Sequence, residues 1–160
     1  MKRKATLVVL SWISCAGLSA IFPALEAREP EMPDPQLTPG AVASRDVAEV
    51  CAMDASGRYT YSPTHRVWRA KRRTLAKYGI PRSQSRFYED DDRVPLCLGG
   101  NNADPRNHWP QPRTDAELKD RLEREVCIAV CDRHSMSLDE AQRLFLGDWR
   151  RAYGMIGRER

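Results

Sequence analysis

The sequence predicts a small α+β domain in which a strand, a loop, a second strand and a long helix follow one another. An acidic run from Tyr88 continues into an apolar stretch that stops at Gly99 and Gly100, which favours a strand entering a turn. His108 and Trp109 indicate a short second strand, and an apolar stripe predicts a helix over residues 115–131. With 160 residues, of which 41% are hydrophobic and 30% charged, a single domain is expected.

Two capping boxes mark the expected helix starts. Thr114 and Glu117 form the first, ahead of the helix over residues 115–131. Ser137 and Glu140 form the second, which opens a final helix ending near Gly154. The apolar positions of this final helix are Leu144, Phe145, Trp149 and Tyr153.

Residues 1–27 have the layout of a secretory signal peptide. Three basic residues at positions 2–4 precede an apolar run over residues 5–22, and we expect cleavage after Ala27. An uncleaved anchor helix and a lipoprotein signal at Cys15 are the alternatives. After cleavage the protein would be exported, periplasmic or secreted, with no stable membrane span. The leader carries three basic residues and one acidic residue, so the net charge would fall from +4 to +2 and would say little about a nucleic-acid partner.

Four cysteines remain once the leader is removed, and an even number in an oxidising compartment predicts two disulfides. They are Cys51, Cys97, Cys127 and Cys131. Cys127 and Cys131 are one helical turn apart, where a bridge between them would strain the backbone, so each is expected to pair with a distant cysteine. We favour Cys51 with Cys131 and Cys97 with Cys127. A zinc site built from all four is the alternative, although the closely spaced pairs typical of such sites are absent.

The segment that follows the leader is rich in proline. Residues 28–42 carry four prolines among polar residues, which predicts an extended linker or arm. The folded domain is then expected over residues 43–160. Within it, residues 46–53 fit either a strand or a helical turn, residues 54–57 a turn, and residues 58–61 a strand.

Residues 64–78 have helical periodicity and a basic face. Four basic residues on this face are spaced by three and four positions: Arg66, Arg69, Arg73 and Lys77. Rows of Lys and Arg neutralise phosphates, so these four are candidate phosphate-binding residues for a nucleic-acid partner. A solvated helix surface is the alternative interpretation.

Several short motifs occur in a fixed order between residues 88 and 131. An acidic strand runs into Val-Pro-Leu-Cys-Leu-Gly-Gly, then Asp-Pro-Arg-Asn-His-Trp-Pro, then a helix with Lys-Asp-Arg-Leu-Glu. In this order the motifs resemble the HNH-like, or ββα-metal, endonucleases, and more narrowly an exported bacterial branch of that family. The resemblance extends weakly back to about Thr38. The matching positions are Tyr88, Glu89, Asp91, residues 94–100, residues 104–107, Trp109, Pro110, Lys119, Asp120, Leu122 and Glu123.

The resemblance implies a ββα-metal core with flanking helices and metal-assisted phosphodiester hydrolysis. In that chemistry an Asp and a helix His bind a divalent metal, a strand His activates water, and an Asn orients the strand His. Carried over, Asp91 would be a metal ligand and Asn107 the orienting residue. The strand His position holds Asp92, and the helix His position holds Cys127.

These two replacements leave two hypotheses. In the first, the protein is a metal-dependent nuclease with an altered site. Asp92 would then serve as base and as a ligand for Mg²⁺, Mn²⁺ or Zn²⁺ beside Asp90 and Asp91, and Cys127 would be a ligand only if it is not in a disulfide. In the second, a bridge from Cys97 replaces the metal, and the protein is a catalytically silent domain that binds an anionic polymer or a protein partner. Surface or packing roles are expected for His65, His108 and His134.

Overall fold

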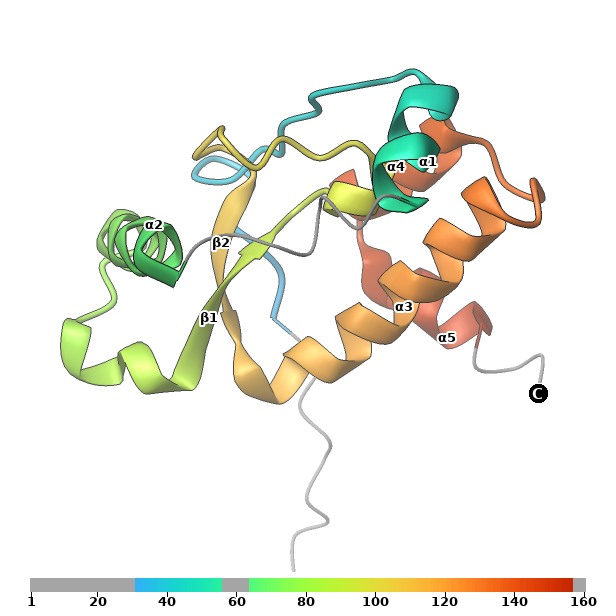
Figure 1. Cartoon of the computed structure of the whole chain (residues 1–160). Coiled ribbons are helices and arrows are strands. Elements are labelled where there is room, and N and C mark those ends of the chain that lie inside the picture. Colours follow the sequence, from blue (N-terminus) through green and yellow to red (C-terminus); the bar gives the residue numbers. More distant parts are fainter. Residues whose placement is uncertain (1–30, 56–63, 157–160) are drawn as a thin grey trace, which may run out of the picture.

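The computed structural model describes residues 31–55 and 64–156, and its architecture is α+β, built on one β-hairpin (Figure 1). Strand β1 (Tyr88–Asp92) pairs antiparallel with β2 (His108–Pro112), so that Asp92 lies opposite His108. Helix α3 (Arg113–Cys131) follows β2 directly. The predicted order of strand, loop, strand and helix is therefore confirmed. The other helical elements are α1 (Val47–Ala55), α2 (Thr64–Lys77), η1 (Arg82–Phe87), η2 (Leu96–Leu98), α4 (Leu138–Leu146) and α5 (Trp149–Ile156).

The hairpin lies between two unequal groups of helices. Helix α2 packs against both strands on one side, while α1, α3, α4 and α5 gather on the other side (Figure 1). The apolar core forms within the larger group, where burial of aliphatic and aromatic side chains supplies the main driving force for folding. Its fully buried members include Val50, Leu98, Leu122, Val126, Phe145 and Trp149. Helix α2 is thus an outlying element that uses one face to cover the hairpin.

Strand β1 is shorter than the sequence predicts. It ends at Asp92, and residues 93–98, which were expected to continue it, turn through the short 3₁₀-helix η2 instead. Pro95 has no N–H to offer a strand ladder. Its carbonyl accepts hydrogen bonds from the N–H groups of Leu98 and Gly100, both at 3.0 Å, which curls the chain back on itself.

Both glycines after η2 are required by the geometry of this turn. Gly99 adopts a positive φ of 79°, a conformation that residues with a side chain rarely adopt. A Cβ atom on Gly100 would lie 1.9 Å from the carbonyl oxygen of Val94. The turn therefore depends on both positions being glycine.

The final predicted helix is in fact two helices. Helix α4 begins at the expected capping box, in which Ser137 and Glu140 bond each other's backbone N–H. It ends at Gly147, and the side chain of Asp148 accepts a hydrogen bond from the N–H of Arg150 at 3.2 Å, which caps the start of α5. A glycine followed by a capping Asp therefore splits the apolar stripe into two elements.

The capping box predicted at Thr114 does not form, because α3 already begins at Arg113, directly after Pro112. For residues 46–53, which fitted either a strand or a helical turn, the structure is helical from Val47 onward as part of α1, whose first N–H groups are capped by the side chain of Asp46. The turn predicted at residues 54–57 is wrong for residues 54 and 55, which are helical and belong to α1. The rest of that turn and the strand expected at residues 58–61 lie outside the described residues.

The described part of the proline-rich segment, residues 31–42, packs against the domain and contains a turn at residues 35–37. Thr38 is fully buried; its hydroxyl contacts that of Tyr78 at 2.8 Å, and its carbonyl accepts a hydrogen bond from Arg93 at 2.8 Å. The N–H of Gly40 donates to the carbonyl of Arg106 at 3.0 Å. These bonds join the arm to the hairpin and to α2.

Two disulfides tie the helices of the larger group together. Cys51 of α1 is bonded to Cys131 of α3, and Cys97 of η2 is bonded to Cys127 of α3. The pairing that we favoured is therefore confirmed, and a zinc site made of four cysteines is ruled out. Disulfides indicate an oxidising environment outside the cytoplasm. In the described ranges, none of the helices has the length and apolarity needed to cross a membrane. The predicted signal peptide lies outside these ranges.

Candidate functional site

The acidic end of β1 points carboxylates to both sides of the hairpin. Successive side chains of a strand alternate between its faces, so Asp90 and Asp92 lie on one face and Asp91 on the other. The face with Asp91 looks toward α3, and Asp90 on the opposite face looks toward α2. The two faces have different chemistry, and each contains residues that the sequence singled out.

On the α3 face, Asp91 binds a buried lysine. The ammonium of Lys119, whose side chain is 1% exposed, donates to Asp91 at 2.6 Å and to Glu123 one helical turn along α3. Burial alone would lower the pKa of Lys119, but the two carboxylates outweigh burial and hold this pKa above its ordinary value. Burial raises the pKa of Glu123 to about 7, and the nearby carboxylates of Asp91 and Asp120 act in the same direction, against the attraction of Lys119.

A hollow of about 450 Å³ opens beside this ion pair. Five carboxylate residues line it, together with Arg124, an apolar wall and the Cys97–Cys127 disulfide. The carboxylate residues are Asp91, Asp92, Asp120, Glu123 and Asp132. The apolar wall consists of Pro95, Leu96 and Ile128. This hollow lies where the resemblance to HNH-like nucleases places the metal, between the first strand and the helix.

The residues around this hollow do not fit the metal that the resemblance implies. The sulfur of Cys127 is covalently bonded to Cys97, so the condition under which Cys127 was a predicted ligand is not met. One oxygen of Asp91 is engaged by Lys119, and Asp92 is bound by Asn107. No three His, Cys, Asp or Glu side chains converge on a metal position anywhere in residues 31–55 and 64–156. The mismatch has two sources: the strand His position holds Asp92, and the helix His position holds a cysteine that is closed in a disulfide.

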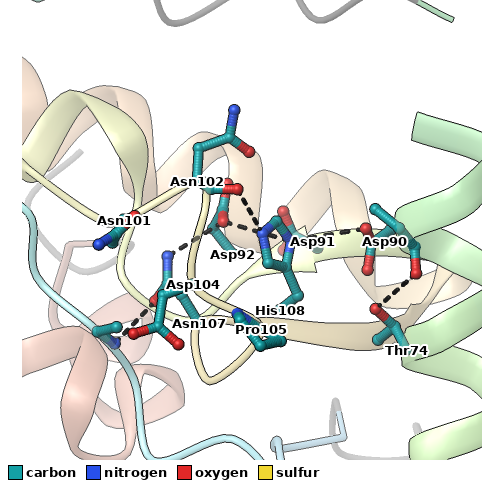
Figure 2. Close-up of polar contacts among 12 residues, drawn as sticks. Thr74, Asp90, Asp91, Asp92, Asn101, Asn102, Asp104, Pro105, Asn107 and His108 are labelled. Atoms are coloured by element: carbon teal, nitrogen blue, oxygen red, sulfur yellow. Dashed lines mark hydrogen bonds and ion pairs between the residues drawn. The ribbon is translucent and has the colours of Figure 1, made fainter. Parts of the chain in front are cut away.

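Asn107 contacts Asp92 in the way that the resemblance implies for the orienting residue (Figure 2). Its side-chain amide donates to Asp92 at 3.1 Å and to the carbonyl of Val94 at 3.0 Å. Its oxygen accepts from the N–H groups of Val94 at 2.9 Å and Ala41 at 3.3 Å. Asn107 is completely buried, so these four bonds fix both the carboxylate of Asp92 and the chain on either side of it.

His108 is the residue of this site that the sequence analysis missed. Its Nδ1 atom lies 3.5 Å from Asp90 and 3.7 Å from Asp92, and its Nε2 atom lies 2.9 Å from the carbonyl of Asn102 (Figure 2). A carbonyl oxygen only accepts hydrogen bonds, so Nε2 carries a proton. The ring therefore bridges the loop before β2 to the acidic end of β1. The register, which places residue 108 opposite residue 92, was the signal that could have revealed this contact.

The carboxyl groups around His108 have raised pKa values. Burial raises the pKa of Asp92 to about 6. The positive charges of His108 and Lys119 act against burial, and the neighbouring carboxylates of Asp91 and Asp90 act with it. Burial likewise raises the pKa of Asp90, whose side chain is only 5% exposed and has one oxygen without a hydrogen-bond partner in the described structure. At neutral pH, Asp92 is therefore a carboxylate that accepts protons far more readily than an exposed Asp does.

The outer face of α2 is exposed and basic. Arg69, Arg72 and Arg73 line an open hollow of about 360 Å³ together with Ala76. Of the four predicted phosphate-binding residues, the structure thus brings Arg69 and Arg73 together. It turns Lys77 inward, where the ammonium donates to the carbonyls of Pro105 and His108. The side chain of Arg66 lies outside the described part of the chain.

Comparison with protein-family models, curated proteins and solved structures gave no match. The class of this protein is therefore defined by its own fold and charged surfaces. It is a small α+β domain with two disulfides, an acidic strand end at its centre and a basic helix on its outer side.

Proposed function

We propose that the protein is an exported domain of the HNH-like ββα type that binds an anionic polymer over α2 and does not hydrolyse it. One observation carries this proposal: the α3 position at which the resemblance places a metal-binding His holds Cys127, whose sulfur is bonded to Cys97. A disulfide sulfur is not the thiolate that binds metals. A covalent bridge between η2 and α3 then does the structural work of a bound metal, and the chemistry that depends on the metal is lost.

The charge of α2 and η1 supports a polyanionic ligand. Between residues 64 and 88 the chain has eight Lys and Arg residues and no Asp or Glu. The described side chains of Arg69, Arg72 and Arg73 form no ion pair with any described carboxylate. Guanidinium groups that lie together on one helix, without an ion pair to a described carboxylate, suit a ligand with repeated negative charges, because each contact releases a counterion.

Two features that agree with each other support export. The layout of residues 1–27 favours a cleaved signal peptide. The two disulfides suit an oxidising compartment such as the periplasm or the exterior. A protein in that location encounters nucleic acids released from cells as well as acidic polysaccharides, and both are polyanions.

The test is a binding and cleavage assay on the mature protein with labelled single-stranded and duplex DNA, RNA and a sulfated polysaccharide. Reversing two charges in the variant Arg69→Glu/Arg72→Glu should weaken binding at least about tenfold and reduce the salt dependence of log Kd by about 1 to 2. The matched control is Arg121→Glu/Arg133→Glu, which reverses two exposed arginines on and after α3 and should bind normally. Equal loss in both variants would mean that only net charge matters and would refute the α2 site.

A metal-dependent nuclease is the second candidate, and the contact between Asn107 and Asp92 favours it. A carboxylate with a pKa of about 6 is a competent general base near neutral pH. The same assay with Mg²⁺, Mn²⁺ and Zn²⁺ separates the candidates. Cleavage that disappears in Asp92→Asn would establish the nuclease and sink the non-catalytic proposal. Intact substrate with all three metals would exclude it.

A further inference from the structure

A second, narrower hollow adjoins Arg73 on the side of α2 that faces the hairpin. Its volume is about 240 Å³, and it lies between α2 and the loop that leads into β2. It is lined by Ala70, Arg73, Thr74, Lys77, Asn102, Ala103, Pro105 and His108. Figure 2 shows the loop residues of this set, Asn102 and Pro105, beside His108. Arg73 borders this hollow and the open one, so the two are neighbours on α2.

The inner wall carries a positive charge that is not neutralised by direct contact. The ammonium of Lys77 has three hydrogen-bond acceptors, the hydroxyl of Thr38 at 3.1 Å and the carbonyls of Pro105 at 2.8 Å and His108 at 2.7 Å. All three acceptors are uncharged. Burial lowers the pKa of Lys77, which is the direction expected for a cation that lacks a contacting anion.

Two acidic groups near Lys77, Asp90 and Asp104, favour its charge without forming a direct ion pair with it in the described structure. Asp104 forms a bidentate pair with Arg106, which holds the pKa of this carboxyl down at about 2. Asp90 lies against the Nδ1 atom of His108. At the mouth of the hollow, the guanidinium of Arg73 is exposed and makes no hydrogen bond or ion pair within the described residues. The hollow therefore combines the exposed guanidinium of Arg73, which can donate hydrogen bonds to a ligand, with the fixed positive charge of Lys77.

From this geometry we infer that the hollow is a socket for a single tetrahedral oxyanion, a phosphate or sulfate group carried by the polymer that α2 binds. Cavities that hold complete drug-sized ligands measure roughly 300 to 1,000 Å³, so a hollow of about 240 Å³ suits a small group. Arg73 donates hydrogen bonds to the oxyanion and Lys77 contributes charge. The inference rests on the proposed polymer binding for the source of the oxyanion, and it adds which group of the polymer is held and where.

Two alanines allow a matched test of this socket. Ala103 is exposed at the narrow hollow, and Ala48 is exposed on α1, across the hairpin from α2. Ala103→Glu places a negative charge in the socket, and Ala48→Glu places the same charge on a surface that takes no part in the proposed binding. Binding of inorganic phosphate and of sulfate is followed by NMR, using the backbone amides of residues 70–77 and 101–108.

We expect saturable binding of phosphate or sulfate to the unmodified protein, with the largest shifts around residues 73–77 and 101–108. Ala103→Glu should weaken this binding at least about tenfold, the order expected for one like charge a few ångströms from an anion at a partly screened site. Ala48→Glu should change it less than about threefold. Equal weakening by both variants, or shifts that never saturate, would overturn the socket.

Competition experiments test the chemical source of the oxyanion separately from the proposed binding of a polymer. Oligonucleotides ending in a phosphate or in a hydroxyl group, and a sulfated oligosaccharide, compete against the inorganic ion. Stronger competition by the phosphate-ended strand assigns a phosphomonoester, and stronger competition by the sulfated sugar assigns a sulfate. If the ion binds but no polymer does, the polymer proposal fails and the socket stands as a small-anion site. If polymers bind while the ions do not, the socket fails.

Discussion

Asn107 holds the acidic end of the hairpin together through four hydrogen bonds. Its orientation is fixed, because its oxygen faces two N–H groups and its nitrogen faces two oxygens. One N–H group, that of Ala41, belongs to the proline-rich arm, and the other, that of Val94, belongs to the loop between β1 and β2. The residue that the resemblance assigns to orienting a catalytic group is thus also a buried polar link between the arm and this loop.

Replacing Asn107 with Ala should therefore destabilise the protein strongly. The buried N–H and carbonyl of Val94 would lose their partners, and each unsatisfied buried group costs about 1 to 3 kcal/mol. We expect a loss of about 3 to 5 kcal/mol in the free energy of unfolding, measured by urea denaturation. Asn101→Ala, which removes one exposed hydrogen bond in the same loop, should cost less than about 1 kcal/mol. Equal effects of the two variants would show that Asn107 is not a structural tie.

Asp92 should make stability fall as the pH rises. Its pKa is raised from 3.8 to about 6 in the folded protein, so the folded state holds the proton more tightly than the unfolded state does. The free energy of unfolding therefore declines between about pH 4 and pH 6. The penalty is complete above pH 6 and amounts to about 3 kcal/mol at most. Glu123, whose pKa is raised to about 7, adds a decline of the same sign.

The variant Asp92→Asn should consequently be more stable than the unmodified protein at pH 7 and equal to it at pH 4. It keeps an oxygen for Asn107 and removes the buried charge. Urea denaturation at several pH values measures the difference. Asp148→Asn is a control of opposite sign, because Arg150 lowers the pKa of Asp148 and the intact carboxylate stabilises the protein at pH 7. A stability gain in Asp92→Asn that does not depend on pH would contradict this assignment.

The residues of the site were predictable from the sequence to the extent that they are close in the chain or belong to a motif. The contact of Asn107 with Asp92 was implied by the resemblance, and it is present. The contact of His108 with Asp90 and Asp92 was not expected, because it depends on the hairpin register, which a single sequence does not specify when the loop is 15 residues long. Burial of Lys119 was missed because charged residues are rarely buried.

At the scale of elements, patterns with a strong period were predicted well. The apolar stripe of α3 and the basic face of α2 gave helices that agree with the structure within one or two residues. The predictions were wrong where a single residue interrupts the periodic pattern of apolar residues. Gly147 ends α4 within a continuous apolar stripe, and Pro95 turns the chain out of β1. A linker or arm over residues 28–42 was expected from its composition, but its described part, residues 31–42, packs against partners in distant segments such as Tyr78 and Arg93.

At the scale of the whole molecule, the disulfides and the basic surface lie on opposite sides of the hairpin. Both disulfides join residues of α1, η2 and α3, whereas residues of α2 line the basic hollows. Helix α2 lies across the hairpin from α1 and α3 (Figure 1). In the chain-entropy description, a bridge stabilises the fold by restricting the unfolded chain. Sequence separations of 30 and 80 residues correspond to about 3.5 kcal/mol for Cys97–Cys127 and about 4.5 kcal/mol for Cys51–Cys131.

This separation predicts that stability and polymer binding can be uncoupled. Replacing Cys97 and Cys127 together with Ser should lower the free energy of unfolding by about 3 kcal/mol. The affinity for the anionic polymer, measured well below the unfolding temperature, should stay within about twofold, because α2 packs against the hairpin and carries neither cysteine. A folded variant that has lost affinity would mean that the acidic hollow takes part in binding. That result would move the functional surface from α2 to the face between β1 and α3.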